Sequence, residues 1–353
     1  LNSFTENCAR DVRLSLVDLK NRGARKLILD LRGNGGGSLA EAVDIVGLFV
    51  PKGTQVVSTR GKLSQASQTF KTQREPLDLT IPLVVLVDGQ SASASEIVAG
   101  AIQDLDRGVV MGWRTFGKGL VQSVRELPYN SSLKITTSKY YTPSGRCVQK
   151  IDYSKAVRSK GEEDKTESAP GEFYTLSGRP VKAAGGITPD VVLKELAVPN
   201  LLFYLANSDI LFDFATDYAH SHPTIAPVDD FVVNDSLYAA FKEAVKASDF
   251  KYDRQSEKAL AALKEVAAFE GYLDEASETF ALLEKQLSHD IDRDFEYFDQ
   301  RIRELLADEL VSRYYYQRGA IIQAIKSDST VFRARDLLAD SMAYRAMLVP
   351  AAK

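Results

Sequence analysis

The sequence predicts an α/β region over residues 1–195, followed by an all-α region over residues 196–353. Two observations carry this prediction. In the first region, short apolar runs typical of buried strands alternate with amphipathic stretches typical of helices. In the second, apolar residues recur at helical spacing with few breakers, and no internal repeat indicates a solenoid. We therefore expect two domains.

The composition is that of a globular protein and disfavours several kinds of partner. A net charge of -4 over 353 residues gives no general reason to bind nucleic acid or an anionic membrane surface. The sequence contains no run of about eighteen apolar residues, so it predicts no integral membrane segment. The two cysteines, Cys8 and Cys147, lack metal-ligand spacing and are expected to be structural thiols. We expect no metal and no cofactor.

The α/β region opens with a helix, a strand, a second helix and a hairpin. Residues 5–21 have helical spacing and stop before Gly23, and residues 26–31 form a short, mostly apolar strand. A helix over residues 39–49 comes next. Residues 51–80 alternate and break, which predicts a hairpin or a surface excursion.

The remainder of this region is mostly β. A strand over residues 82–87 leads through a tight elbow into a helix over 92–105. Three β-rich runs, 108–112, 121–127 and 133–141, are expected to extend the same sheet. The next segment, 150–172, is charged and predicts a solvated loop, and a turn near 185 leads into a last strand ending at 193. The helices expected after residue 195 are 201–218, 235–247, 256–269, 276–305, 308–325 and 329–347.

A glycine-rich loop follows the first strand. Four of the five residues from Gly33 to Gly37 are glycines, and a helix begins directly afterwards. Glycines let backbone N–H groups turn toward an anion, and a helix N-terminus adds a favourable field. The loop matches neither common nucleotide-binding pattern. The loop therefore predicts an anion-binding site made of backbone amides, and the alternative is an ordinary tight turn without a binding role.

The elbow over residues 90–100 carries three serines separated by alanines. Ser91, Ser93 and Ser95 stand at alternate positions where one hydroxyl can project from the turn, a place for a nucleophile. A serine nucleophile needs a base. All three histidines lie in the helical region, at positions 220, 222 and 289. One of them would have to reach across the domain boundary to act as the base. The other candidate base is Lys118, whose pKa would be lowered by burial; a solvated loop lysine is the equal alternative.

Five ordered motifs lie within residues 1–195. They are LDLRGNGGG (29–37), SASASEIVAGAIQD (91–104), TFGKGLVQ (115–122), YYTPSGR (140–146) and GITPD (186–190). Together they resemble the carboxyl-terminal processing (tail-specific) serine protease family. The resemblance implies a sheet-and-helix core similar to that of the crotonase and Clp-type peptidases. It also implies a serine endopeptidase that cleaves proteins near or from their C-terminal tails.

The resemblance also implies roles for individual residues. Ser93 matches the nucleophile, Lys118 the base and Gln122 the glutamine that orients the lysine. The oxyanion would be held by the amide of Ala94 and by one from the glycine loop, where Gly36 or Gly37 is expected. Asp104 matches an acidic position with a supporting role. Ser91 and Ser95 would then be structural, with Ser95 as a possible helix cap.

Two features depart from the family pattern. Members usually carry a PDZ domain before or within the first part of the core, and none is seen in this sequence. Gly35 stands where many relatives have proline, which is expected to loosen the loop without removing its amides. The helical region of residues 196–353 resembles accessory C-terminal domains of some bacterial members.

The resemblance implies protein or peptide substrates bound through extended C-terminal segments, beside a sheet edge, and allows a homo-oligomer. It implies a cell-envelope location, periplasmic or extracytoplasmic. Two other functions stay open. One is a catalytically inert peptide-binding scaffold of the same fold, with the helical region as the partner surface. The other is a crotonase-like acyl-transfer enzyme, which would use the glycine loop but would not require Lys118.

Overall fold

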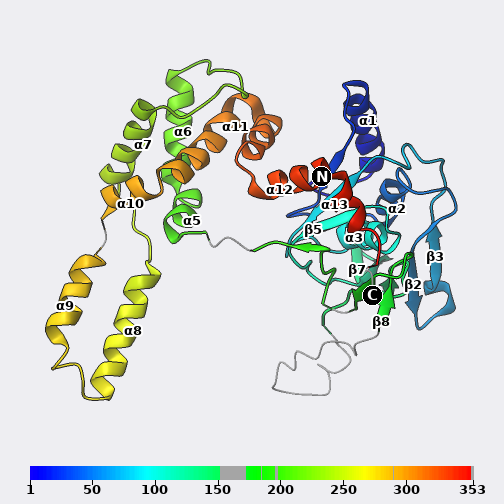
Figure 1. The fold of residues 1–353 in the computed structure, drawn as a ribbon, viewed down its shortest axis with the longest axis horizontal. Helices are drawn as coiled ribbons and strands as arrows, with labels where there is room; N and C mark the ends of the chain where they lie inside the picture. Colours follow the sequence, from blue (N-terminus) through cyan, green and yellow to red (C-terminus); the bar gives the residue numbers. More distant parts are fainter. Residues whose placement is uncertain (152–171, 184, 195–197, 289, 351–353) are drawn as a thin grey trace. The chain divides into compact units, whose positions relative to one another are not determined.

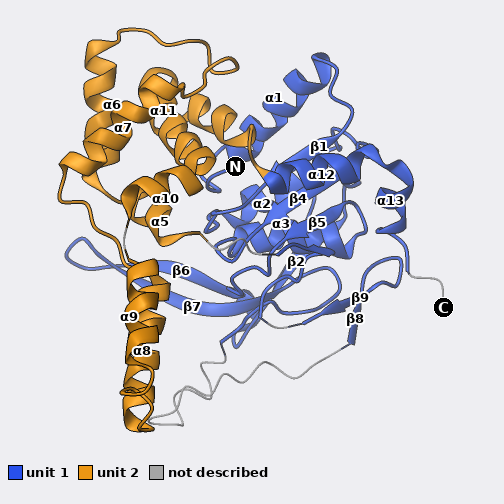
Figure 2. Ribbon diagram, turned by 60° about the vertical axis from the view of Figure 1, so that its left-hand side comes forward, with its two compact units in different colours: residues 1–195, 329–353 blue, residues 196–328 orange. Residues whose placement is uncertain are grey.

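The computed structural model describes residues 1–151, 172–183, 185–194, 198–288 and 290–350 (Figure 1). The chain divides into two compact units (Figure 2). Unit 1 comprises residues 1–195 and 329–353, and unit 2 comprises residues 196–328. An α/β region followed by a helical region is confirmed. The last helices, however, belong to unit 1, so the helical unit ends at 328 and does not extend to 353.

A parallel sheet forms the centre of unit 1. Its strand order is β1-β4-β5-β10, with every neighbouring pair parallel. Parallel strands need crossover connections, and helices supply two of them. The strands are β1 (Leu27–Asp30), β4 (Leu83–Val87), β5 (Val109–Gly112) and β10 (Val191–Val192), and the helices before and between them are α1 (Cys8–Asn21), α2 (Leu39–Val46) and α3 (Ala94–Asp104).

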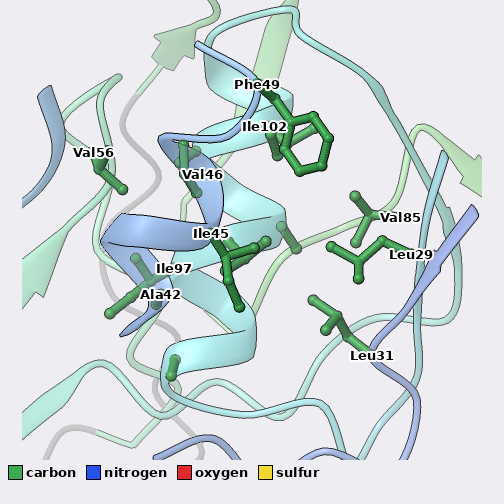
Figure 3. Close-up of a cluster of buried hydrophobic side chains, with 14 of the residues drawn as sticks. Leu29, Leu31, Ala42, Ile45, Val46, Phe49, Val56, Val85, Ile97 and Ile102 are labelled. Carbon is green, nitrogen blue, oxygen red and sulfur yellow. The ribbon is translucent and has the colours of Figure 1, made fainter. Parts of the chain in front are cut away.

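The central strand β4 is buried on both faces, as expected for a parallel sheet. Side chains alternate along a strand, so Leu83, Val85 and Val87 point into the core beneath α2 and α3 (Figure 3). Val84 and Leu86 point to the opposite face and pack in a second cluster. Both faces of this strand therefore require a helical layer.

The opposite face is covered by the C-terminal helices α12 (Ser329–Ala339) and α13 (Ser341–Ala346). Ala334, Leu338 and Tyr344 are buried against that face. The sequence predicts one helix over 329–347 and assigns it to the helical region. The structure breaks it at Asp340, whose carboxylate caps α13 through the N–H groups of residues 342 and 343.

A second, antiparallel sheet has the order β3-β2-β7-β6. It contains β2 (Gln55–Gly61), the single turn η1 (Ser64–Ala66), β3 (Gln68–Lys71), β6 (Leu120–Leu127) and β7 (Ser131–Tyr141). The hairpin predicted over residues 51–80 is confirmed as β2–β3. The prediction that 121–127 and 133–141 extend the parallel sheet is wrong. Tyr129 and Asn130, with φ values of 64° and 53°, reverse the chain into a hairpin that pairs with β2.

A small hairpin precedes β10, the last strand of the α/β part of the chain. It pairs β8 (Glu172–Tyr174) with β9 (Pro180–Lys182), and the sequence reasoning missed it. Strands of three residues leave too short a pattern to recognise. The solvated loop predicted over residues 150–172 lies almost entirely outside the described residues.

In the described residues of unit 2, the regular elements are all helices, and they enclose a core of their own that includes Phe241, Phe295, Leu306 and Leu310. Several predicted helix boundaries are wrong. The helix predicted over 201–218 is broken between Ala206 and Asp209. The helix predicted over 276–305 is interrupted before Asp290, which caps the next helix, and no break occurs near residue 306. The helices are α5 (Asn200–Ala206), α6 (Asp209–Ser221), α7 (Asp235–Ala247), α8 (Gln255–Phe269), α9 (Ser277–Gln286), α10 (Ile291–Tyr297) and α11 (Asp299–Ile325).

Membrane-spanning helices were sought throughout the described ranges. None of their helices combines the length and the apolar character that crossing a bilayer requires.

Candidate active site

Three loops meet at one edge of the parallel sheet because their strands are neighbours. The glycine loop follows β1, the serine elbow follows β4, and the segment leading to Lys118 follows β5. The carboxyl ends of adjacent parallel strands share an edge, where sites in such sheets commonly form. Two backbone hydrogen bonds join these loops: Ala92 N–H donates to Asn34 O at 3.0 Å, and Phe116 N–H donates to Ser91 O at 3.0 Å.

The elbow distinguishes one serine from the other two. Ser91 and Ser95 are fully buried, and their hydroxyls donate to Leu31 O and Asn34 O, both at 2.8 Å. Ser93 is half-buried and has φ 57° and ψ -111°, a strained backbone for a residue with a side chain. It is the N-cap residue of α3, so the expectation that Ser95 caps this helix is wrong.

A buried carboxylate, Glu96, joins the elbow to the lysine loop. Its Oε2 accepts hydrogen bonds from the N–H groups of Ser93 at 2.9 Å and Lys118 at 2.8 Å. Its Oε1 accepts from the hydroxyl of Thr115 at 2.7 Å and from Gly117 N–H at 2.8 Å. Burial raises the pKa of this carboxyl, and the hydrogen bonds oppose that shift.

The sequence reasoning missed Glu96. A signal was available, since a serine followed three residues later by a glutamate at a helix start is the capping-box pattern. Tyr140 was also missed, although it lies within one of the five motifs. This tyrosine is buried, its hydroxyl donates to Ser93 O at 3.1 Å, and burial raises its pKa. Tyr140 holds the elbow from outside it, whereas Glu96 lies within the elbow and joins it to the lysine loop.

Lys118 and Ser93 are held together through their backbones. The Lys118 side chain is half-buried. Both residues belong to the described part of the chain, and no hydrogen bond joins the Ser93 hydroxyl to the Lys118 ammonium. Gln122 lies on β6 beside a register shift, is exposed, and forms no side-chain hydrogen bond with any described residue.

The glycine loop lies against the elbow at Gly36. A Cβ atom built on Gly36, which has φ 101°, would be 2.8 Å from Ser93 Cβ and 3.0 Å from Ala94 N. Only glycine permits this approach. The Gly36 N–H donates to Asn34 Oδ1 at 2.9 Å. Among the described residues, the N–H groups of Gly37 and Ala94 have no such partner.

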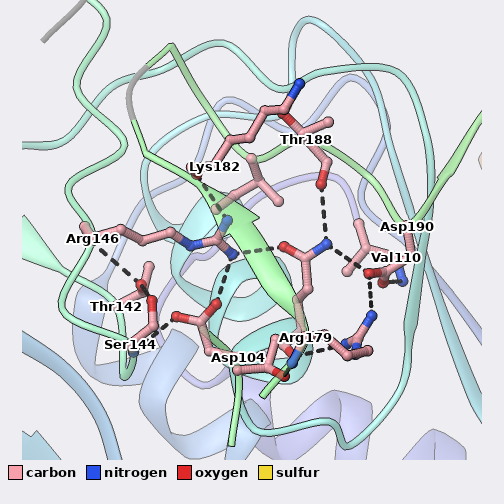
Figure 4. A network of polar contacts seen from close by, with 12 residues as sticks. Asp104, Val110, Thr142, Ser144, Arg146, Arg179, Lys182, Thr188 and Asp190 are labelled. Atoms are coloured by element: carbon pink, nitrogen blue, oxygen red, sulfur yellow. Dashed lines mark hydrogen bonds and ion pairs between the residues drawn. The ribbon is translucent and has the colours of Figure 1, made fainter. Parts of the chain in front are cut away.

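Asp104 lies at the C-terminal end of α3 within a buried polar network (Figure 4). Its carboxylate accepts from the Arg146 guanidinium at 2.7 Å and from Ser144 N–H at 3.0 Å. Arg179 continues the network to Asp106 and Asp190. These buried ion pairs connect the turn before Arg146 to α3 and to the segment that leads into β10.

Among the described residues, no histidine or cysteine side chain forms a hydrogen bond to these three loops. His220 and His222 are exposed in unit 2, and His289 lies outside the described residues. Cys8 and Cys147 are free thiols, and burial raises the pKa of both. Over the described ranges, no three His, Cys, Asp or Glu side chains form a group that could hold a metal ion.

The fold and these motifs define a peptidase domain. Residues 1–156 match the model of Peptidase family S41, and residues 201–338 match the model described as "Probable PDZ-protease, C-terminal helical domain". The α/β region is thus similar to peptidase family S41, and the resemblance to carboxyl-terminal processing proteases is confirmed.

Individual relatives agree with this assignment. The chain is 41% identical over 155 residues to a carboxy-terminal-processing protease of Bartonella bacilliformis, a match that covers 43% of this chain and 36% of that protein. It is 39% identical over 144 residues to carboxyl-terminal-processing peptidase 1, chloroplastic, of Arabidopsis thaliana, covering 41% of this chain and 29% of that one. This chain thus matches about a third of the length of these relatives.

Among solved structures, the chain is similar to a photosystem II D1 C-terminal processing protease. The similarity has a TM-score of 0.41 and 31% identity, and it covers 55% of this chain and 41% of that one.

Proposed function

We propose that this chain is the catalytic part of a serine endopeptidase in which Ser93 is the nucleophile and Lys118 the base. The observation that carries the proposal is the shared acceptor Glu96 Oε2, which receives the backbone N–H groups of both residues. The strained backbone and partial exposure of Ser93 support its choice over Ser91 and Ser95.

In the proposed reaction, the Ser93 oxygen bonds to the carbonyl carbon of a peptide while neutral Lys118 takes the hydroxyl proton. The peptide C–N bond then breaks, and the proton passes from Lys118 to the leaving amine. Water next attacks the acyl-enzyme ester, gives a proton to Lys118 and releases the carboxylic acid product. Ser93 recovers its hydroxyl proton in that step.

The proposed oxyanion donors are the N–H groups of Ala94 and Gly37. Gly36, the other residue expected from the motif, already donates its N–H to Asn34. Each preorganised donor is worth about 3 kcal/mol of transition-state stabilisation. Gln122 as the residue that orients Lys118 stays a prediction, and Asp104 is proposed to support the site through Arg146.

The proposed substrates are proteins cleaved near or from their C-terminal tails, bound as an extended strand. Strand β6 begins two residues after Lys118 and forms an edge of its sheet, so a peptide paired with it would run past the site. The proposed location is the cell envelope. The protein names of the relatives, bacterial and chloroplastic processing proteases, support both proposals.

The test uses an unfolded model protein incubated with the wild type, Ser93→Ala and Lys118→Ala. We expect cleavage by the wild type and none by either variant, with all three equally folded by circular dichroism. Cleavage that survives either substitution would exclude the dyad. A wild type that binds the unfolded protein without cleaving it would favour the scaffold alternative.

A further inference from the structure

The loop that carries Lys118 is held by side chains on both sides of the lysine. Glu96 accepts the N–H groups of Gly117 and Lys118. The next N–H, of Gly119, donates to Oε1 of Gln149 at 2.7 Å. Three consecutive backbone donors are thus satisfied by side chains from two other segments. The Gly119 carbonyl in turn accepts from Tyr140 N–H on β7 at 2.9 Å.

Gln149 is well placed for this contact. It is 5% exposed, and its other amide atom, Nε2, donates to Ile151 O at 3.1 Å. Its chain neighbour Lys150 donates its N–H to Gly117 O at 2.9 Å. Both the side chain and the backbone of this segment therefore hold the lysine loop.

The two glycines beside Lys118 are explained by the same segment. A Cβ atom on Gly119 would lie 2.8 Å from Gln149 N, and one on Gly117 would lie 2.7 Å from Lys150 Cβ. Neither position has room for a side chain. The glycines thus let residues 149 and 150 approach the loop closely enough to form these hydrogen bonds.

We infer that Gln149 is a positioning residue that sets the place of Lys118 through the Gly119 N–H; this inference rests on the proposed role of Lys118 as base. Without the acceptor, the buried Gly119 N–H loses its partner, and the loop must move to satisfy it. A displacement of about 1 Å in a catalytic group can lower the rate about 100-fold.

Two variants separate hydrogen bonding from packing. Gln149→Met keeps the length of the side chain and removes the acceptor. Gln149→Glu keeps an acceptor for Gly119 N–H, adds a negative charge and, like Gln149→Met, removes the Nε2 donor to Ile151 O. Gln73→Met is the matched control, because Gln73 is exposed and its side chain donates only to Lys71 O. All variants are made in the full chain, and activities are divided by the folded fraction.

We expect Gln149→Met to lower kcat about 10- to 100-fold, and Gln149→Glu to retain more activity than Gln149→Met. Equal activity of the Met and Glu variants, or a Met variant as active as the wild type, would overturn the inference.

A readout independent of cleavage is amide hydrogen exchange in the segment containing Gly119. Exchange should accelerate in Gln149→Met and stay close to wild type in Gln149→Glu and Gln73→Met. Unchanged exchange in Gln149→Met refutes the contact itself. Ser93→Ala and Lys118→Ala are assayed in parallel, so a failure of the proposed dyad is seen separately from a failure of Gln149.

Discussion

The backbone N–H groups of Ser93 and Lys118 donate to the same oxygen atom, Glu96 Oε2, at 2.9 and 2.8 Å. These residues come from loops after two adjacent strands, β4 and β5. A shared acceptor holds both loops at a definite separation, although no hydrogen bond joins the two side chains. The proposed site therefore depends on a residue that touches neither of the two proposed reacting atoms, Ser93 Oγ and Lys118 Nζ.

The strained backbone of Ser93 predicts a conflict between stability and activity. With φ 57° and ψ -111°, Ser93 occupies a region that glycine adopts freely. We expect Ser93→Gly to be more stable than Ser93→Ala by about 1 kcal/mol, and both variants to lack cleavage activity. Urea denaturation of the two variants measures the difference. A Ser93→Ala protein at least as stable as Ser93→Gly would contradict the assigned strain.

Replacing the central acceptor should damage both folding and activity. Four donors converge on the Glu96 carboxylate, which only accepts hydrogen bonds, whereas an amide places an NH2 group against some of them. We expect Glu96→Gln to lose about 2–3 kcal/mol of stability and at least about 100-fold in kcat. Chemical denaturation and cleavage assays measure both.

The exposed Glu75 provides the control for that change, because it forms only a long ion pair, with Lys52, at 3.9 Å. Glu75→Gln should match the wild type in both assays. If Glu96→Gln is also as stable and active as the wild type, the carboxylate does not hold the two loops together.

The C-terminal helices should be necessary for the stability of unit 1. The buried hydroxyl of Tyr344 on α13 accepts from Leu83 N–H at 2.9 Å and donates to Leu83 O at 3.1 Å. Tyr344→Phe leaves this strand N–H unpaired, and we expect a loss of about 2 kcal/mol. Thermal unfolding measures it, with Tyr174→Phe as the exposed control. Equal stability of the two variants would show that the contact contributes nothing.

Unit 2 contains a carboxyl group whose pKa differs between the folded and unfolded states. Partial burial, with the nearby Glu304 and Glu309, raises the pKa of Asp308 to about 6. The unfolded chain, with a pKa near 3.9, loses this proton first as pH rises, so the folded state is progressively destabilised between about pH 4 and pH 6. Above pH 6 the penalty is complete.

Asp308→Asn should therefore stabilise the chain at pH 7.5 by on the order of 1 kcal/mol, after allowance for solvent screening. The gain should shrink toward zero at pH 4. Thermal unfolding of variant and wild type at both pH values measures the difference, and the exposed Asp274→Asn serves as control. A gain that is equal at both pH values would argue against titration of Asp308.

Local patterns predict the parts of the site that lie within single loops. The glycine run, the alternate serines and the lysine between glycines are short segments whose backbone needs are visible in their residue types. The side chains that hold these segments together are harder to predict from the sequence. Glu96 and Tyr140 act on loops distant along the chain, and their contacts depend on strand order.

The fold shows the same division. The buried strands and most helices follow from apolar spacing, since that spacing reflects burial on one or two faces. Apolar spacing does not predict which sheet β6 and β7 belong to, because a strand can pair with many segments that are distant along the chain. Nor does the spacing of apolar residues reveal that α12 and α13 cover the sheet of unit 1, since any apolar face would satisfy an amphipathic helix.

By itself, then, the sequence determined the α/β region, the helical region and the three loops that carry the candidate chemistry. Only the tertiary structure decided that these loops follow neighbouring strands of one sheet. It also decided that Glu96 and Gln149 hold the lysine loop, and that the final helices belong to the α/β unit. The physical reason is that residue spacing records local geometry and burial, whereas hydrogen bonds between distant segments exist only after the chain has folded.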